Sequence, residues 1–378
     1  MKTIQLKKQS GSSDWQYLSK RQDLIKPLVL AFGNRFLLED KNLYQEIKNI
    51  FLDRHIVIGS SCADITANNV DDNCITITAI EFEKTSFLIK TSNVLHADFD
   101  SFKTGNEIIK KFPINGLKYV FVISEGSFVN GSQLTKGMNS ATGDNLLITG
   151  ALCGDADRFE KTLASYNENP KPGEIVAVGF YGESLEVTFS VYGGWTPFGP
   201  ERIVTKATGN VLYELDNKPA LDLYKKYLGD KSKELPGSAL LYPLNVLNID
   251  EEQSIVRTII NIDEANNAMI LAGDIPENSK VQLMMTNVDN IANASERAAK
   301  QAMALRKNKP ELAILVSCIG RKLVLDQRVE EEIDEVTEVL GNQTIVSGFY
   351  SYGEIAPFHG EMSCQLHNQT MTVTLISE

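Results

Sequence analysis

Strand-like and helix-like segments alternate along the second half of the chain, and this order constrains the fold more than any other feature. Residues 281–287 (VQLMMTN) and 311–318 (ELAILVSC) have the apolar composition of strands, and 343–349 (QTIVSGF) resumes as a third. Between them, apolar residues recur at three- and four-residue steps across 291–305 and 329–340, as on one face of a helix. Strands joined by helices run parallel, so the sequence predicts an α/β fold with mixed sheets flanked by helices.

A similar order occupies the first half of the chain. Residues 107–112 (EIIKKF) and 132–139 (SQLTKGMN) predict helices, and 119–124 (YVFVIS) and 146–155 (LLITGALCGD) predict strands. Both halves place glycines and then an acidic residue at a strand end, so we expect two related α/β lobes. Chance similarity is the alternative, because this pattern is common in α/β proteins.

The boundary between the two lobes is expected in the least periodic part of the chain, residues 214–244. Prolines and glycines interrupt that stretch at Pro219, Gly229, Pro236 and Gly237. The sequence therefore predicts a first lobe over residues 1–218 and a second lobe over 219–378.

Each lobe is expected to close with antiparallel strands. Residues 173–191 alternate between apolar and polar side chains and carry turn residues at 181–183, which is typical of a hairpin. Residues 361–378 show the same alternation, with 368–369 as the expected turn.

The charge of the chain limits the classes of partner that it can bind. The formal net charge is −12 and the basic residues are scattered, which argues against nucleic acid or anionic lipid as a partner. The first residues lack an apolar signal segment, and no apolar run is long enough for a bilayer, so we expect a cytoplasmic protein. Five cysteines without CxxC spacing suggest neither a disulfide framework nor a zinc ribbon.

Three glycine-rich segments at strand ends are the candidate ligand site: 59–64 (GSSCAD), 150–155 (GALCGD) and 348–354 (GFYSYGE). In open α/β sheets, ligands bind at the carboxyl ends of parallel strands, where backbone N–H groups and helix N-termini face a crevice. We therefore expect the three segments to converge on one hollow. The candidate binding residues are Ser61, Cys62, Asp64, Asp155, Ser317, Arg321, Tyr352, Gly353 and Glu354.

Glu354 and Arg321 are the charged members of this site that suggest its ligand. A carboxylate aimed into the cleft and a guanidinium beside the neighbouring strand end at Ser317 would together suit a zwitterion such as an amino acid. The alternative is that Glu354 and Arg321 only pair with each other or cap helices, and that Gly353 only serves a turn.

Catalytic signatures are absent from the sequence. It contains no GxSxG elbow, no GxxxxGK[ST] loop, no GxGxxG fingerprint and no HExxH motif. We therefore expect a protein that is not an enzyme. An enzyme that uses Cys62 or Glu354 at the strand-end cleft is kept as an alternative, because both residues stand at the expected position.

The four histidines raise the question of a metal or haem. His359, Cys364 and His367 follow an H-x4-C-x2-H spacing, but on a strand Cys364 and His367 would point to opposite faces, which is unsuited to one zinc ion. No cofactor is expected. Haem is the alternative, because a single axial ligand suffices, and the candidates are His55, His96, His359 and His367.

The chain resembles a stand-alone FIST protein, with a FIST N domain followed by a FIST C domain. The resemblance covers nearly all residues from about 30 onward. It is carried in the second half by ELAILVSCIGRK (311–322), VSGFYSYGEIAP (346–357) and LHNQTMTVTLI (366–376). In the first half, VIGSSCADI (57–65) and LLITGALCGDADRFEKT (146–162) resemble the glycine-rich segments of the family.

The sequence departs from the family pattern at two places. Cys62-Ala63-Asp64 stands where Ala-Gly-Glu is usual, and Ala151-Leu152-Cys153 stands where small residues and serine are common. These departures concern the ligand preference rather than the fold.

The resemblance implies a sensory module of bacterial signal transduction. Such a module would bind a small ligand, for example an amino acid, and act on a separate partner such as a histidine kinase, a cyclic-di-GMP enzyme or a chemotaxis receptor. Part of the family is similar to haem-binding nitric-oxide sensors, so a haem-based sensor is the alternative within the same class.

Overall fold

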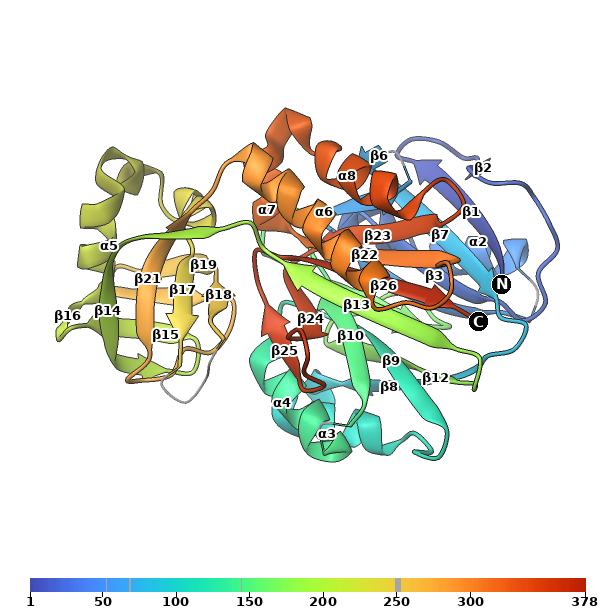
Figure 1. Cartoon of the computed structure of the whole chain (residues 1–378), viewed down its shortest axis with the longest axis horizontal. Coiled ribbons are helices and arrows are strands. Elements are labelled where there is room, and N and C mark those ends of the chain that lie inside the picture. The colour runs from blue at the N-terminus through green and yellow to red at the C-terminus, as the bar shows by residue number, and fades with distance from the viewer. Residues whose placement is uncertain (52, 68, 144, 249–252) are drawn as a thin grey trace.

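The computed structural model of the chain describes residues 1–378 except 52, 68, 144 and 249–252. It forms three six-stranded mixed sheets and a separate eight-stranded antiparallel sheet (Figure 1). The three mixed sheets make up the larger body, which we call the core. The eight-stranded sheet belongs to a smaller body formed by residues 196–285, which we call the insert.

The strands of each mixed sheet are given in the order in which they pair. Sheet 1 consists of β11 (Ala164–Tyr166), β4 (His55–Ser60), β3 (Leu28–Gly33), β7 (Cys74–Glu81), β1 (Lys2–Gln9) and β2 (Gln16–Tyr17). Sheet 2 consists of β25 (Cys364–His367), β24 (Gly353–Pro357), β10 (Leu147–Leu152), β9 (Leu117–Ser124), β12 (Glu174–Tyr181) and β8 (Ser86–Asn93). Sheet 3 consists of β13 (Glu186–Tyr192), β26 (Met371–Ser377), β22 (Leu312–Cys318), β23 (Ile345–Ser351), β5 (Ala63–Thr66) and β6 (Asn69–Asp71).

The three mixed sheets share one topology. Each contains a parallel pair, which is β3 and β4 in sheet 1, β9 and β10 in sheet 2, and β22 and β23 in sheet 3. After the second strand of each pair, the chain leaves its sheet and adds an antiparallel strand to another. It passes from β4 to β5 in sheet 3, from β10 to β11 in sheet 1, and from β23 to β24 in sheet 2. The exchange is cyclic, so every mixed sheet gives one strand and receives one.

The predicted mixed sheets flanked by helices are confirmed, and the internal repeat has a third unit. Segment 59–64 follows the same path at the end of β4 as the other two glycine-rich segments follow at the ends of β10 and β23. The predicted boundary at residue 218 falls inside the insert, and sheets 2 and 3 contain strands from both sides of it. The division into lobes at that residue stays a prediction.

Helices cover the outer faces of the core (Figure 1). Helices α3 and α4 pack against each other beside sheet 2, and α6 packs on β13 and β26 of sheet 3 and on α8. Their bounds, with those of the other core helices, are α1 (Arg35–Leu38), α2 (Leu43–Ile50), η1 (Val94–Ala97), α3 (Ser101–Lys110), α4 (Gly131–Thr142), α6 (Val288–Ala304), α7 (Ile319–Leu325), η4 (Asp326–Arg328) and α8 (Glu331–Leu340). None of the described helices combines the length and apolarity that a bilayer crossing needs.

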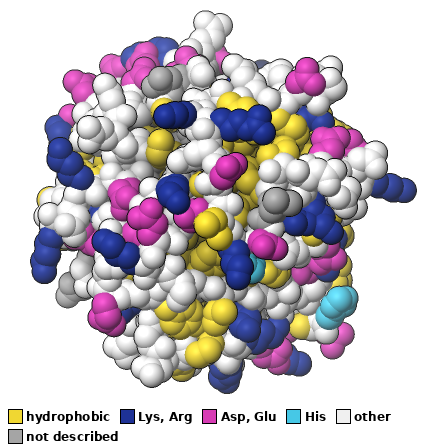
Figure 2. Space-filling model, turned by 90° about the vertical axis from the view of Figure 1, so that its right-hand side faces the viewer, with side chains coloured by type: hydrophobic (Ala, Val, Ile, Leu, Met, Phe, Trp, Pro, Cys, Tyr) yellow, Lys and Arg dark blue, Asp and Glu magenta, His cyan; other side chains and the backbone are white. Residues whose placement is uncertain are grey.

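A shared apolar core lies where the three mixed sheets face one another. It contains buried side chains from all of them, including Phe32 of sheet 1, Phe121 of sheet 2 and Phe349 of sheet 3. The rings of Phe32 and Phe349 stack with their centroids 4.2 Å apart. On the face of the molecule shown in Figure 2, acidic and basic side chains are interspersed around apolar ones.

The insert leaves the core after β13 and returns at α6. It has its own buried cluster, which includes Leu212, Tyr224 and Met269. Its elements are β14 (Thr196–Thr208), β15 (Val211–Leu215), β16 (Lys218–Pro219), α5 (Ala220–Leu228), η2 (Gly229–Glu234), η3 (Gly237–Leu241), β17 (Leu244–Leu247), β18 (Ile255–Arg257), β19 (Ile259–Asp263), β20 (Ala268–Leu271) and β21 (Lys280–Met285).

Three predicted pairings are wrong. The first strand–helix–strand pass does not join parallel neighbours, because β21 pairs with β14 and β17 in the insert whereas β22 lies in sheet 3. The predicted hairpin over 173–191 is two strands in different sheets, since β12 pairs with β8 and β9 while β13 pairs with β26. The predicted hairpin over 361–378 fails likewise, because β25 pairs with β24 and β26 pairs with β22 and β13. In each case the segment between the strands carries the chain from one sheet to another.

Candidate functional site

The three glycine-rich segments meet at the centre of the core through a ring of backbone hydrogen bonds. Cys62 N donates to Tyr350 O at 2.8 Å, and Tyr352 N donates to Leu152 O at 3.2 Å. Gly154 N closes the ring by donating to Ser60 O at 2.9 Å. The segments therefore converge as the sequence indicates, and each holds the next.

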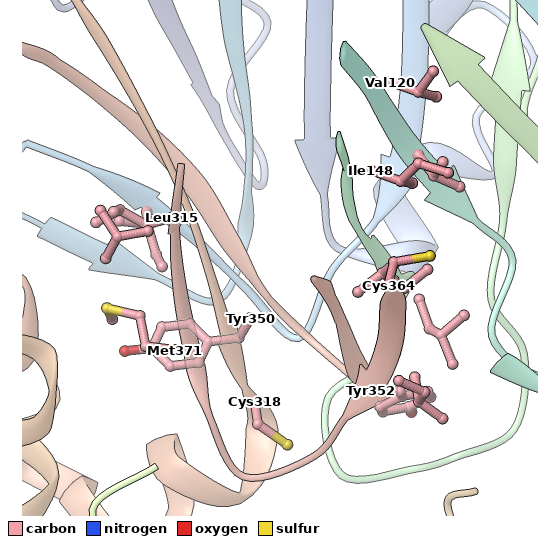
Figure 3. Packing of buried hydrophobic residues seen from close by; sticks show 14 of the residues in the cluster. Val120, Ile148, Leu315, Cys318, Tyr350, Tyr352, Cys364 and Met371 are labelled. Carbon is pink, nitrogen blue, oxygen red and sulfur yellow. The ribbon is translucent and has the colours of Figure 1, made fainter. Parts of the chain in front are cut away.

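The centre of this ring is filled by protein atoms. A Cβ at position 154 would lie 2.2 Å from Sγ of Cys62, so glycine is required there. Burial raises the pKa of the Cys62 thiol well above its ordinary value, which keeps it protonated. Tyr350, Tyr352, Cys318 and Met371 pack around the same bends (Figure 3). The expected hollow does not open at this point.

Two of the bends carry the same carboxyl arrangement. Ser61 Oγ donates to Asp64 Oδ1 at 2.6 Å, and Ser351 Oγ donates to Glu354 Oε1 at 2.7 Å. Both carboxyl groups are fully buried. Burial raises the pKa of Asp64 to about 7 and that of Glu354 to about 8, against the opposing effect of the serine hydrogen bonds. These two predicted site residues therefore serve as internal hydrogen-bonding groups that hold a proton more readily than exposed carboxyl groups do.

The third bend replaces that pair by an ion cluster. Asp155, which is fully buried, accepts hydrogen bonds from Arg35 Nε at 3.0 Å and from Arg158 Nη2 at 2.6 Å. Arg35 stands at the first turn of α1, directly after β3, and was missed by the sequence analysis. Its position after a strand-like run and Gly33 is the signal that could have identified it.

Arg321 does not pair with Glu354, so the alternative in which these two residues only pair with each other is wrong. Its partner is Glu332 of α8, which accepts from Arg321 Nη2 at 2.6 Å and from Ser317 Oγ at 3.0 Å. Both members of this ion pair are fully buried. Glu332 looked like one of several solvent-facing acids in the sequence 330–335, so it too was missed.

Tyr352 and Gly353 lie at the bend between sheets 3 and 2. The Tyr352 hydroxyl accepts a hydrogen bond from Phe159 N at 2.9 Å, and the two rings stack with centroids 4.3 Å apart. Tyr352 and Leu152 line a cavity of about 230 Å³, together with Phe128, Phe159 and residues 271–273 of the insert. The predicted binding residue Tyr352 therefore lines a cavity at a strand end.

A larger cavity of about 450 Å³ lies between the core and the insert, and we call it the seam cavity. The core side is formed by residues 191–195, by one face of α6 and by residues of the β24–β25 connection and the end of β25. The insert side is formed by Thr196, by Ser254 and by residues of β17, β18 and β21. The side chains that project from these elements include Trp195, Asn245, Ser254, Met284, Asn290, Asn293, Arg297, Phe358, His367 and Thr370.

Two predicted site residues, Arg321 and Glu354, do not line the seam cavity but bond to residues that do. Arg321 donates through Nη1 to Gly193 O and through Nη2 to Ile291 O, which joins the cavity wall at β13 to helix α6. Glu354 accepts from Thr370 Oγ1 at 2.8 Å, and Thr370 lines the cavity. The buried polar network thus connects the central bends to the seam.

The four histidines lie on different segments of the chain. His55 Nδ1 is 2.7 Å from the Tyr166 hydroxyl, and His96 lies in η1. His359 follows β24, and His367 ends β25 with Nε2 3.0 Å from Ala356 O. Burial lowers the pKa of His367 to about 4, so it is neutral. In the part of the chain that the structure describes, no three His, Cys, Asp or Glu side chains are grouped so as to hold a metal ion.

Solved structures show distant similarity to this chain. Cyanuric acid hydrolase from A. caulinodans has 7% sequence identity and a TM-score of 0.38, over 93% of this chain and 89% of that one. A chorismatase has 9% identity and a TM-score of 0.33, over 99% of this chain and 98% of that one. Similarity at this level carries no inference about function.

Sequence relatives are more informative about the family. The uncharacterized protein MJ1623 of Methanocaldococcus jannaschii is 25% identical over 254 residues, which are 57% of this chain and 47% of that protein. The chain thus matches about half the length of this relative. The model of the FIST N domain matches residues 27–218, and that of the FIST C domain matches residues 220–357. The chain therefore belongs to the FIST family.

Proposed function

We propose that the protein is a cytoplasmic sensor that binds a small ligand, such as an amino acid, in the seam cavity. In this proposal it then regulates a separate signalling partner, such as a histidine kinase or a cyclic-di-GMP enzyme. FIST domains are sensory domains of signal-transduction proteins, which supports the general role. The proposal includes no catalytic step.

The observation that carries the proposal is the position of the seam cavity between two bodies with separate apolar cores. Its volume of about 450 Å³ lies within the range usual for small-molecule sites, and its lining combines apolar and hydrogen-bonding groups. A ligand that contacts both bodies would favour one arrangement of the insert on the core over others.

Existing contacts between the two bodies show how they are held together. The Asp274 carboxylate of the insert accepts from Asn130 Nδ2 at 2.9 Å and from Gln133 Nε2 at the start of α4. Arg257 of β18 donates to Leu366 O at 2.9 Å, and Gln369 Nε2 donates to Leu240 O at 2.9 Å. A ligand in the seam cavity would add contacts between the core and the insert to those that already exist.

The central bends are less suited to hold the ligand themselves. Asp64, Asp155 and Glu354 are fully buried, and their oxygens accept hydrogen bonds from protein donors. A ligand that reached them would have to break bonds already formed, at a cost of about 1–3 kcal/mol for each buried group left unpaired.

Calorimetric titration with the common amino acids tests this function. We expect at least one of them to bind the wild-type protein, and to bind the Asn293→Trp variant at least 10-fold more weakly because the indole fills the cavity. Lys300→Trp is the matched control, since Lys300 lies on the same helix, is exposed and does not line the cavity. Absence of binding by all amino acids would count against an amino-acid ligand, and unchanged binding in Asn293→Trp would place the ligand elsewhere.

A further inference from the structure

The seam cavity has an unusual charge for this protein. Its described lining contains one charged side chain, Arg297, and no aspartate or glutamate, although the whole chain carries a formal net charge of −12. His367 also lines it, but its lowered pKa leaves the imidazole neutral. Among the described residues, the cavity therefore has a cationic lining on an acidic molecule.

Arg297 is available to a ligand. It is exposed, and the structure shows no hydrogen bond or ion pair from its guanidinium to any other described residue. Asn290, Ala294 and Arg297 follow one another at four- and three-residue steps, so they lie on the same face of α6. Asn290 belongs to the first turn of this helix, whose N-terminal end adds partial positive charge at the cavity.

One part of the lining is apolar and suits an apolar ligand body. Trp195 donates its indole N–H to Gln369 O at 3.1 Å, so the ring offers mainly its apolar surface. Phe358 packs edge-on against His367, with ring centroids 4.9 Å apart, and Val256 and Met284 line the cavity from the insert. This aromatic and aliphatic surface suits a flat or branched hydrocarbon group, and it lies in the same lining as the polar side chains Asn245, Asn290, Asn293 and Thr370.

From this lining we propose that the seam cavity selects a monocarboxylate with an apolar body and no ammonium group. The carboxylate pairs with Arg297, and the body lies against Trp195 and Phe358. A guanidinium binds a carboxylate through two parallel hydrogen bonds, which favours this anion over a neutral amide. An ammonium group would enter a lining whose described side chains offer it no carboxylate partner, and its desolvation would be uncompensated.

This inference rests on the proposed function for a small ligand in the same cavity, and it replaces the amino acid named there by a carboxylate that lacks the ammonium group. Its test compares three probes with one carbon skeleton by calorimetry: 3-phenylpropanoate, phenylalanine and 3-phenylpropanamide. We expect 3-phenylpropanoate to bind at least about 10-fold more tightly than either of the others, as for a hydrogen-bonded charge pair.

Two variants identify the charge responsible. Arg297→Gln should weaken binding of 3-phenylpropanoate by about 10- to 100-fold and leave the amide unaffected. Lys300→Gln is the control, because it removes a positive charge one turn further along α6 and outside the cavity. It should change the affinity of neither 3-phenylpropanoate nor the amide.

Three results would overturn the inference: no binding of 3-phenylpropanoate, equal or tighter binding of phenylalanine, or equal affinity in Arg297→Gln. Tighter binding of phenylalanine that is abolished by Asn293→Trp would refute the ligand class and leave the proposed function standing. Binding of 3-phenylpropanoate that Asn293→Trp does not weaken would refute both, because the ligand would then lie outside the seam.

Discussion

Asp64 and Glu354 are acids that the fold uses as buried hydrogen-bonding groups. Each lies three residues after a serine whose hydroxyl bonds to it, and each also accepts a backbone N–H, from Thr76 and Thr370 respectively. The sequence indicated that acids stand at these strand ends. It did not show that they are buried, because a serine and an acid after a glycine are equally compatible with an open cleft.

The raised pKa of Glu354 predicts a pH dependence of stability. Between about pH 4.5 and 8 the folded protein holds a proton that the unfolded chain releases, so the free energy of unfolding falls as pH rises through this window. Glu354→Gln removes this contribution. From pH 5 to pH 8.5, the free energy of unfolding of the wild type should therefore fall by at least about 2 kcal/mol more than that of the variant.

Urea unfolding at several pH values measures the difference between the two proteins. Glu338→Gln, which replaces an exposed carboxyl, is the control and should follow the wild type. If Glu354→Gln shows the same dependence on pH as the wild type, Glu354 is ionised in the folded protein and our description of the bend is wrong.

The positions of individual strands and helices could be predicted where the local pattern of apolar residues determines them. Strands β9, β10, β22 and β23 and helices α4, α6 and α8 lie where apolar runs and helical stripes place them. The partner of each strand was not predictable, because alternation in β12 and β13 fixes which side chains are buried and not which sheet buries them. A turn that changes sheets has the same residue composition as a hairpin turn.

The parallel pairs of strands depend on glycines with no room for a side chain. A Cβ at Gly348 in β23 would lie 1.9 Å from Leu315 O of β22, and one at Gly150 in β10 would lie 2.1 Å from Val122 O of β9. Gly348→Ala should therefore reduce the free energy of unfolding by about 3 kcal/mol or more, because backbone must move.

Chemical denaturation followed by near-ultraviolet circular dichroism checks this expectation. Gly237→Ala is the matched control: its added Cβ meets no atom within 4 Å, so stability should stay within about 1 kcal/mol of the wild type. Equal stabilities of Gly348→Ala and Gly237→Ala would show that β22 and β23 are not as closely paired as described.

At the scale of the whole molecule, three mixed sheets exchange strands around one centre and carry an insert on one side (Figure 1). The convergence of the three glycine-rich segments could be predicted from the sequence because each follows a parallel strand. The seam cavity could not be predicted. Arg297 lies on a helix that is far in sequence from any glycine-rich segment, and only the tertiary fold brings it beside the insert. The predicted residues Arg321 and Glu354 contribute by supporting the cavity wall, and Ser317 bonds to Glu332, the partner of Arg321.

The most direct test of this account is a crystal structure of the protein with the tightest-binding member of the amino-acid and carboxylate probes. We predict ligand electron density in the seam cavity, in contact with α6 of the core and with β17 or β18 of the insert. Density at the central bends or in the cavity beside Tyr352, with the seam cavity empty, would contradict the account.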